Sequence, residues 1–200
     1  MKNLNTYINE KLKISKSSYN YHPKTKEELK EILEQLIEKR GNNGNFNDID
    51  TSEITDMSKL FYLWEEFNGD ISKWNVSNVI TMERMFDYCE NFNQDISKWD
   101  VSNVENMISL FNKCEKFNQP LNDWDVSKVK DMGTMFSRCK SFNQPLDNWN
   151  VSNVTDMRYM FDQCKLFNKD ISNWNVSKVT NKYYMFRGCP IEEKYKPKFK

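Results

Sequence analysis

Five cysteines recur at a fixed interval of 25 residues, and they are the side chains with the clearest capacity for metal or redox chemistry. They are Cys89, Cys114, Cys139, Cys164 and Cys189. A metal site needs ligands that converge on one point, usually through C-x-x-C spacing or partner histidines, and the only histidine is His22. Cysteines spaced this way in a repeat form a line, so we predict no metal and no cofactor. We interpret them as small buried apolar residues, and disulfides between adjacent copies stay open for an oxidising medium.

Each repeat also carries an Asn or Asp two residues before a serine, and aligned oxygen atoms are the ligands that calcium prefers. The glycine-rich turns and dense carboxylates of calcium-binding repeats are absent from the sequence, so capping and turn bonding are favoured. If the segment is extended, these residues point away from the core and form an outward polar face where a partner would dock. The candidate binding residues are Asn75, Ser77, Asp100, Ser102, Asp125, Ser127, Asn150, Ser152, Asn175 and Ser177.

Catalytic patterns are not found. The sequence has no glycine-rich phosphate loop and no nucleophile elbow, and a single histidine limits any triad. Its carboxylates are spread along the chain, with no pair that the spacing forces together. We therefore expect a protein that is not an enzyme, with no catalytic residues.

Two further columns could bind ligands or build the interior. The tryptophans, which are Trp74, Trp99, Trp124, Trp149 and Trp174, could be platforms for sugars, but aromatic columns in a repeat protein favour a stacked core. An Asn beside a Phe recurs at Asn68, Asn93, Asn118, Asn143 and Asn168. It could form a binding row, but an amide repeated once per unit favours a hydrogen-bonded ladder between units.

The period of 25 residues predicts a solenoid, because a unit this small cannot bury its apolar side alone. In WNVSNV the apolar positions suit a short strand with Trp and the first Val inward. In VTDMRYMFDQC they recur at spacings of three and four, which is typical of a helix of about two turns. A turn at FNQP or FNKD completes the unit. We expect about six strand–helix–turn units, the first a degraded copy that begins at Phe46.

The chain divides into three parts on this basis. Residues 1–45 break the period and form a helical cap or attachment segment, with one helix over Leu4–Leu12 and a second after the capping box Thr25–Glu28. Capping the first repeat is favoured, and docking of residues 1–18 onto another protein or assembly is the alternative. Residues 46–189 form the solenoid, and residues 190–200 a charged, loose C-terminal tail.

The repeated phrases W-[DN]-V-S-[NK]-V, M-x-x-[ML]-F-x-x-C and F-N-x-[DP]-[IL] run through residues 67–189, about two thirds of the chain. They resemble the repeats of BspA-like leucine-rich-repeat proteins, of the type abundant in mycoplasma surface lipoproteins. The resemblance implies a leucine-rich-repeat-like α/β solenoid and, as in many relatives, adhesion or protein binding at a cell surface. It brings no catalytic residues.

Charge excludes one partner class and leaves the location open. The sequence has 29 basic and 29 acidic residues, and residues 42–189 carry 16 basic and 21 acidic ones. Nucleic-acid backbones need clustered Lys and Arg, so we expect no nucleic-acid partner. The N-terminal sequence shows no secretory signal and no lipid-attachment cysteine, and no stretch suits membrane insertion. Cytoplasmic location is the expectation, whereas the resemblance suggests a cell surface.

These observations predict a non-enzymatic protein-binding module that engages a protein partner through its exposed strand face. The alternative is a structural, assembly or surface-adhesion component, of a cell surface or a virus-like particle, attached through its N-terminal helices. A glycan ligand is a weaker third option.

Overall fold

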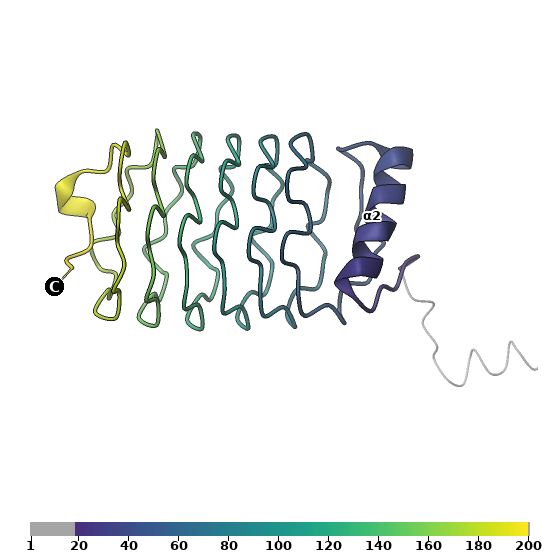
Figure 1. Ribbon diagram of the computed structural model, residues 1–200, viewed down its shortest axis with the longest axis horizontal. Coiled ribbons are helices and arrows are strands. Elements are labelled where there is room, and N and C mark those ends of the chain that lie inside the picture. Colours follow the sequence, from purple (N-terminus) through teal and green to yellow (C-terminus); the bar gives the residue numbers. More distant parts are fainter. Residues whose placement is uncertain (1–18, 200) are drawn as a thin grey trace, which may run out of the picture.

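The computed structural model describes residues 19–199. Successive 25-residue units lie side by side along one axis, with helix α2 at the N-terminal end and a short helix η1 at the other (Figure 1). Isolated parallel bridges connect the same position of neighbouring units, from Asp56–Thr81 through to Asp156–Asn181. The repeat seen in the sequence is therefore a repeat in space.

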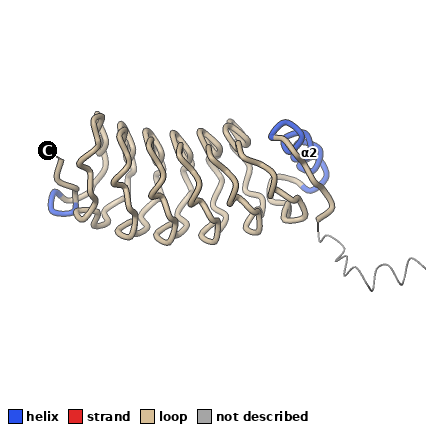
Figure 2. The backbone as a smooth tube through the Cα atoms, turned by 90° about the horizontal axis from the view of Figure 1, so that it is seen from below, coloured by secondary structure: helices blue, strands red, loops and turns tan. Residues whose placement is uncertain are grey.

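The predicted strand–helix–turn architecture is wrong. Between residues 19 and 199 the regular elements are α2, Lys26–Arg40, and the 3-10 helix η1, Glu193–Tyr195, and neither lies inside a repeat. The repeats carry single bridges and no sheet, so they are drawn as loops throughout (Figure 2). The chain is a stack of turns and not an α/β solenoid of leucine-rich-repeat type.

Residues 57–64 show why the helix prediction failed. Alternate N–H groups in this segment close four-residue β-turns, as Leu60 N–H does by donating to the carbonyl of Met57 three residues back. The N–H groups between them donate sideways to the next unit, as Phe61 N–H does to Met85 at 2.9 Å. Consecutive turns place positions i, i+3, i+4 and i+7 on one side, as a helix also does. The apolar spacing alone could not separate the two structures.

Backbone dihedrals confirm that these segments are not helical. Two residues of most repeats have positive φ, for example Lys59 at 57° and Leu63 at 67°. Left-handed geometry is costly for a residue that carries a Cβ atom. The sideways hydrogen bonds between units offset that cost, because they satisfy backbone groups that would otherwise be unpaired.

The predicted strand in W-x-V-S-x-V is also a series of turns. Trp74 N–H donates to Ile71, and Val79 N–H donates to Val76, each three residues back. The indole Nε1–H of Trp74 reaches across to the carbonyl of Phe46, and the other repeat tryptophans make the same bond to the preceding unit. Each indole therefore bonds one unit to the one before it.

The core is one continuous column of side chains, as the repeat predicts. The five repeat tryptophans are only 3–4 % exposed, which confirms a core role for them. Two files of phenylalanines run beside them, one with ring centroids 5.4–5.8 Å apart from Phe61 to Phe186 and another with 5.9–6.1 Å from Phe67 to Phe167. A single unit could not bury these rings without its neighbours.

Helix α2 is confirmed where the capping box predicted it. The Thr25 hydroxyl accepts a hydrogen bond from Glu28 N–H, and Gly41, with φ of 72°, ends the helix by donating to Ile37. Leu29, Leu33 and Leu36 are buried. The helix thus covers the first unit. The other predicted helix, Leu4–Leu12, lies outside the described residues.

The predicted loose tail is wrong as far as the structure describes it. Ile191 is buried, and the carbonyl of Tyr195 accepts a hydrogen bond from Ile171 N–H at 3.0 Å. Residues 190–199 therefore pack on the last unit. Both ends of the stack are covered, one by α2 and the other by this segment (Figure 1).

Candidate functional site: the charged corner surface

The ten predicted binding residues do not lie on a strand face, because the repeats that carry them contain no strand. In every pair the side-chain oxygen of Asn or Asp accepts the N–H of the serine two residues on, at 3.0–3.2 Å. This is an Asx turn, and for Asp125 the bonds from Ser127 also lower the pKa of the carboxyl group. The oxygens are occupied in turn formation, and they follow one another along the stack without converging. Their role in binding stays a prediction.

The Asn column is a ladder, as predicted. The Oδ1 atom of Asn68 accepts the N–H of Asn93 at 2.9 Å, and the same bond recurs from each Asn to the next unit up to Asn168, which accepts from Glu192. Gln94, Gln119 and Gln144 donate to the carbonyls of these asparagines. The side-chain oxygens of these asparagines therefore accept hydrogen bonds from the next unit, and the column is not a free binding row.

The cysteines are free, and Cys89, Cys114, Cys139 and Cys164 are buried. Each of these four thiols donates to a phenylalanine carbonyl of the preceding unit, at 2.8–3.0 Å. Burial raises the pKa of each thiol, so the groups are poor nucleophiles. This geometry agrees with their interpretation as small core residues. Over residues 19–199, no group of three or more His, Cys, Asp or Glu side chains is placed to hold a metal ion.

A different surface concentrates exposed and varied side chains. On either side of each cysteine position, which Trp64 occupies in the first unit, the chain turns a corner and presents three exposed or half-buried side chains, and five such rows follow one another along the stack. We call these fifteen residues the corner surface. They are Leu63, Glu65 and Glu66; Tyr88, Glu90 and Asn91; Lys113, Glu115 and Lys116; Arg138, Lys140 and Ser141; and Gln163, Lys165 and Leu166.

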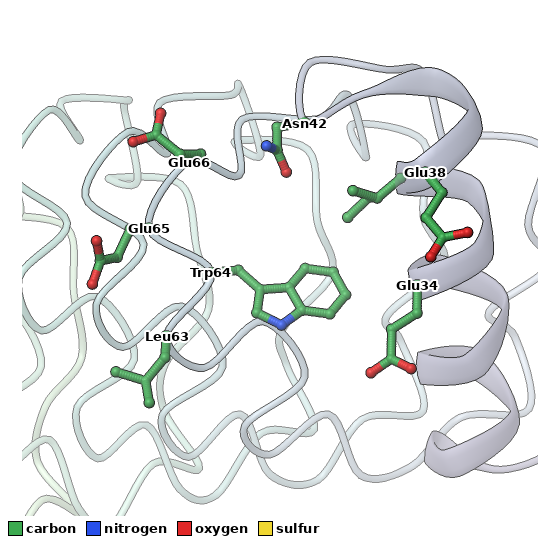
Figure 3. Close-up of a pocket in the computed structure, with 8 residues that line it drawn as sticks. Glu34, Glu38, Asn42, Leu63, Trp64, Glu65 and Glu66 are labelled. Carbon is green, nitrogen blue, oxygen red and sulfur yellow. The ribbon is translucent and has the colours of Figure 1, made fainter.

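The first row of the corner surface borders an acidic groove of about 630 Å³. Glu34 and Glu38 of α2 form one wall and Glu65 and Glu66 the other, with Trp64 between them (Figure 3). Trp64 occupies the place that cysteine holds in the later units, so its larger side chain reaches the surface and is half-buried. The neighbouring Leu63 is 50 % exposed. The groove therefore combines four carboxylates with an apolar side.

The other end of the corner surface is basic. A cleft of about 270 Å³ is lined by Arg138, Lys140, Lys165, Arg187 and the amide of Gln163. Asp162 binds Arg187 in a two-pronged ion pair and raises the pKa of its guanidinium, and Glu115 lies 2.6 Å from the ammonium of Lys140. None of the residues that line the cleft is a carboxylate. Cations therefore line this cleft, although two of the four are paired with the carboxylates of Asp162 and Glu115 just outside it.

The change of sign is gradual along the rows. The fifteen residues give net charges, from the first row to the fifth, of −2, −1, +1, +2 and +1. Sequence reasoning missed this surface because it followed the positions that repeat. The position after each cysteine, or after Trp64 in the first row, carries the signal and is occupied in turn by Glu65, Glu90, Glu115, Lys140 and Lys165. The sequence of that one position already separates acidic units from basic ones.

An elongated surface with opposite charges at its ends and apolar side chains beside them can bind a protein of complementary charge. The groove and the cleft bring together no nucleophile, general base and ordered donors in one enclosed site of the kind that catalysis needs. Among residues 19–199, none of the helices has the length and apolar content to cross a bilayer.

Comparison with known families gives one match. The family model described as Mycoplasma protein of unknown function, DUF285, matches residues 28–148 and again residues 121–194, so it spans the repeats and most of α2. Searches of curated proteins and of solved structures gave no match. By the extent of the family match, the chain belongs to the Mycoplasma protein family DUF285.

Proposed function

We propose that the protein is a non-enzymatic protein–protein interaction module that binds its partner through the corner surface. The observation that carries this proposal is the acidic groove, where Glu34, Glu38, Glu65 and Glu66 lie beside the exposed Leu63. Charged side chains steer a partner and fix its register, and apolar ones contribute burial. Both kinds of side chain are present in one place.

The chemistry of the surface favours a protein partner over the other classes. Nucleic acids need a continuous basic surface, whereas the corner surface is basic only at one end. Aromatic platforms for sugars would have to be exposed, and the five repeat tryptophans are 3–4 % exposed. A protein can match both signs of charge along one surface. The resemblance to BspA-like repeat proteins, many of which bind proteins at a cell surface, supports the same class.

The acidic groove sets the chemistry of the partner segment. Four carboxylates next to Leu63 and Trp64 favour a basic segment that also carries apolar side chains. The Glu side chains and Leu63 are accessible, so the segment needs no rearrangement of α2 or the first repeat. The ten Asx-turn residues offer less, because the five Asn and Asp side chains already accept backbone hydrogen bonds from the serines.

Two synthetic peptides of equal charge test the proposal. One contains lysine and leucine, and the other has serine in place of leucine; binding of each labelled peptide to dilute protein is followed by fluorescence anisotropy. We expect the leucine peptide to bind more tightly, and Glu65→Lys to weaken it by about tenfold, as lost charge pairing in a partly desolvated site predicts. Equal binding of both peptides, or no binding of either, would overturn the groove as a binding site.

The matched control is Glu31→Lys, which makes the same charge change on an exposed residue of α2 that does not line the groove. We expect the control to bind the leucine peptide nearly as well as the wild type. An equal loss in both variants would reduce the effect to overall charge and would count against a specific site.

A further inference from the structure

We propose that a second copy of this chain is a partner of the corner surface, and that the two copies pair antiparallel about a two-fold axis through the third row. The inference rests on the proposed function and names a partner for it. It is carried by one property of the corner surface: when the order of its rows is reversed, acidic positions meet basic ones in the four outer rows.

The rows have the regular spacing that such pairing needs. A sideways backbone bond connects each row to the next unit: Leu63 N–H donates to Asp87 at 3.0 Å, Lys113 N–H to Ser137 at 2.8 Å, and Gln163 N–H to Arg187 at 2.7 Å. Asn91, Lys116 and Ser141 donate to the carbonyls of the glutamates one unit earlier. The side chains of two facing surfaces would therefore stay in register over all five rows.

The outer rows show the complementarity most clearly. A two-fold axis across the stack places the first row of one copy on the fifth row of the other, with the order within each row kept. Glu65 then faces Lys165. The exposed Leu63 and Leu166, at 50 % and 56 %, come to the same end of the interface. The acidic groove receives a basic surface with an apolar side chain, which is the chemistry that the proposed function assigns to its partner.

The second and fourth rows match in the same way. Glu90 faces Lys140, and the ring of Tyr88 faces the guanidinium of Arg138. Tyr88 already accepts one cation on its ring, because the ammonium of Lys113 lies 3.7 Å from the ring centroid. Contact between Tyr88 and Arg138 would add a second cation–aromatic pair. Both ends of the interface gain these contacts, since a two-fold axis repeats every pair.

The residues beyond the five rows continue the match. The third row faces the same row of the second copy, so Lys113, Glu115 and Lys116 each meet their own counterpart, and the opposite-charge pairs lie in the four outer rows. One step beyond the first row lie Glu34 and Glu38 of α2, and one step beyond the fifth lies Arg187. Antiparallel pairing therefore brings the glutamates of α2 toward Arg187 of the second copy.

Other arrangements of two copies are disfavoured by the same charges. Parallel pairing would set Glu65 against Glu65 and Lys165 against Lys165, and like charges repel. End-to-end stacking would need an open end, but α2 and residues 190–199 cover the two ends. The antiparallel pair is closed by its symmetry and stops at two copies.

Charge-reversed variants test the pairing, with full-length protein studied by sedimentation velocity in low-salt buffer. Glu65→Lys/Glu90→Lys makes all four outer positions basic, and Lys140→Glu/Lys165→Glu makes them all acidic. We expect the wild type to dimerise, each variant alone to stay monomeric, and an equimolar mixture of the two to form a heterodimer. In that mixture every basic position faces an acidic one, so all four pairs are restored.

Salt and a control variant complete the design. Because three of the four pairing charges are exposed and Glu90 is half-buried, the dissociation constant should rise at least about tenfold between 20 mM and 500 mM salt, as screening predicts. Lys73→Glu/Lys98→Glu has the same net charge as the acidic variant but changes exposed residues away from the corner surface, and it should dimerise like the wild type.

Each other outcome counts against the pairing. A wild type that stays monomeric up to about 1 mM at low salt would overturn it, because a dissociation constant above 1 mM corresponds to a binding free energy weaker than about −4 kcal/mol. So would dimers that survive in both charge-reversed variants, or assemblies that grow beyond two copies. If the leucine peptide still binds the groove in these cases, the proposed function stands and the identity of its partner falls. If peptide binding is lost as well, both the proposed function and the pairing of two copies are contradicted.

Discussion

The interior of the stack and its corner surface differ in how their residue types change from one unit to the next. In the interior, the same residue type returns at each step, as at the tryptophan and cysteine positions. At the corner, the type changes from unit to unit and the charge changes sign. The difference shows that a residue type repeats where its side chain contacts the neighbouring units. Positions at the corner, outside the shared core, can vary, and these positions can bind a partner.

The largest expected effect breaks the interior. Trp124→Ala removes a ring that is 3 % exposed and its Nε1–H bond to Ile96, so the free energy of unfolding should fall by about 3–5 kcal/mol, as for other buried tryptophans. Urea denaturation measures it. Trp124→Phe keeps most of the ring volume and serves as the control, with a smaller loss. A change below about 1 kcal/mol for the alanine variant would mean that the units do not share their core.

Alkaline pH should weaken the interior through its thiols. Burial raises the pKa of Cys114 in the folded state well above its ordinary value of 9.0, so the unfolded chain loses the proton first. The stabilising contribution of the protonated thiol is therefore complete below about pH 9 and is lost as the pH rises above it. One such thiol changes stability by about 1.4 kcal/mol per pH unit in that range.

Cys114→Ala isolates this contribution. We expect the variant to lose stability less steeply than the wild type between about pH 9 and pH 10, measured by urea denaturation at fixed ionic strength. The comparison uses the slopes, because the substitution also removes a buried side chain at every pH. Equal slopes for the two proteins would show that Cys114 ionises as readily in the folded state as in the unfolded one.

The ladder lies between interior and surface and should show an intermediate effect. Asn118→Ala removes the Oδ1 acceptor of Asn143 N–H and leaves that donor without its partner in the neighbouring unit. We expect a loss of about 1–2 kcal/mol, the usual cost of an unsatisfied, partly buried donor. Thermal unfolding measures it. A loss no larger than that of the exposed variant Asn148→Ala would contradict the ladder as a source of stability.

The smallest expected effect on folding comes from the corner. Lys140→Ala removes an exposed cation whose ion pair with Glu115 is solvent-accessible. Such pairs contribute about 0–1 kcal/mol, so the free energy of unfolding, measured in urea, should hardly change. The same variant should weaken self-association, which sharpens the contrast with Trp124→Ala. A loss of stability close to that of Trp124→Ala would mean that the corner surface contributes to folding as much as the interior does.

Sequence reasoning found the period, the core columns, the asparagine ladder and helix α2, because each depends on one residue type held at a fixed position or on a local capping signal. It failed for the elements within a unit. Overlapping turns, each closed by a hydrogen bond to the carbonyl three residues back, give Met57, Leu60 and Phe61 the spacing of a helix, and only the sideways bonds to the next unit separate the two. Those bonds join residues about one repeat apart, so no local pattern indicates them.

The candidate site escaped prediction for a related reason. The ten predicted residues are positions that repeat, and in the structure the side-chain oxygens of the five Asn and Asp residues accept turn bonds from the five serines. The signs at Glu65, Glu90, Glu115, Lys140 and Lys165 differ, so a search for fixed columns passes over them. The packing of residues 190–199 escaped prediction because Ile191 and Tyr195 lie in a stretch dominated by charge and proline.

The sideways bonding pattern has a consequence for how such a chain changes over generations. Since every unit presents its neighbour with the same donors and acceptors, duplication or deletion of one whole unit would leave both covered ends intact and alter only the length. Such an event would also change the distance between the acidic and basic ends. Lineages could thus alter which surfaces fit each other by gaining or losing whole units, without any substitution at the surface itself.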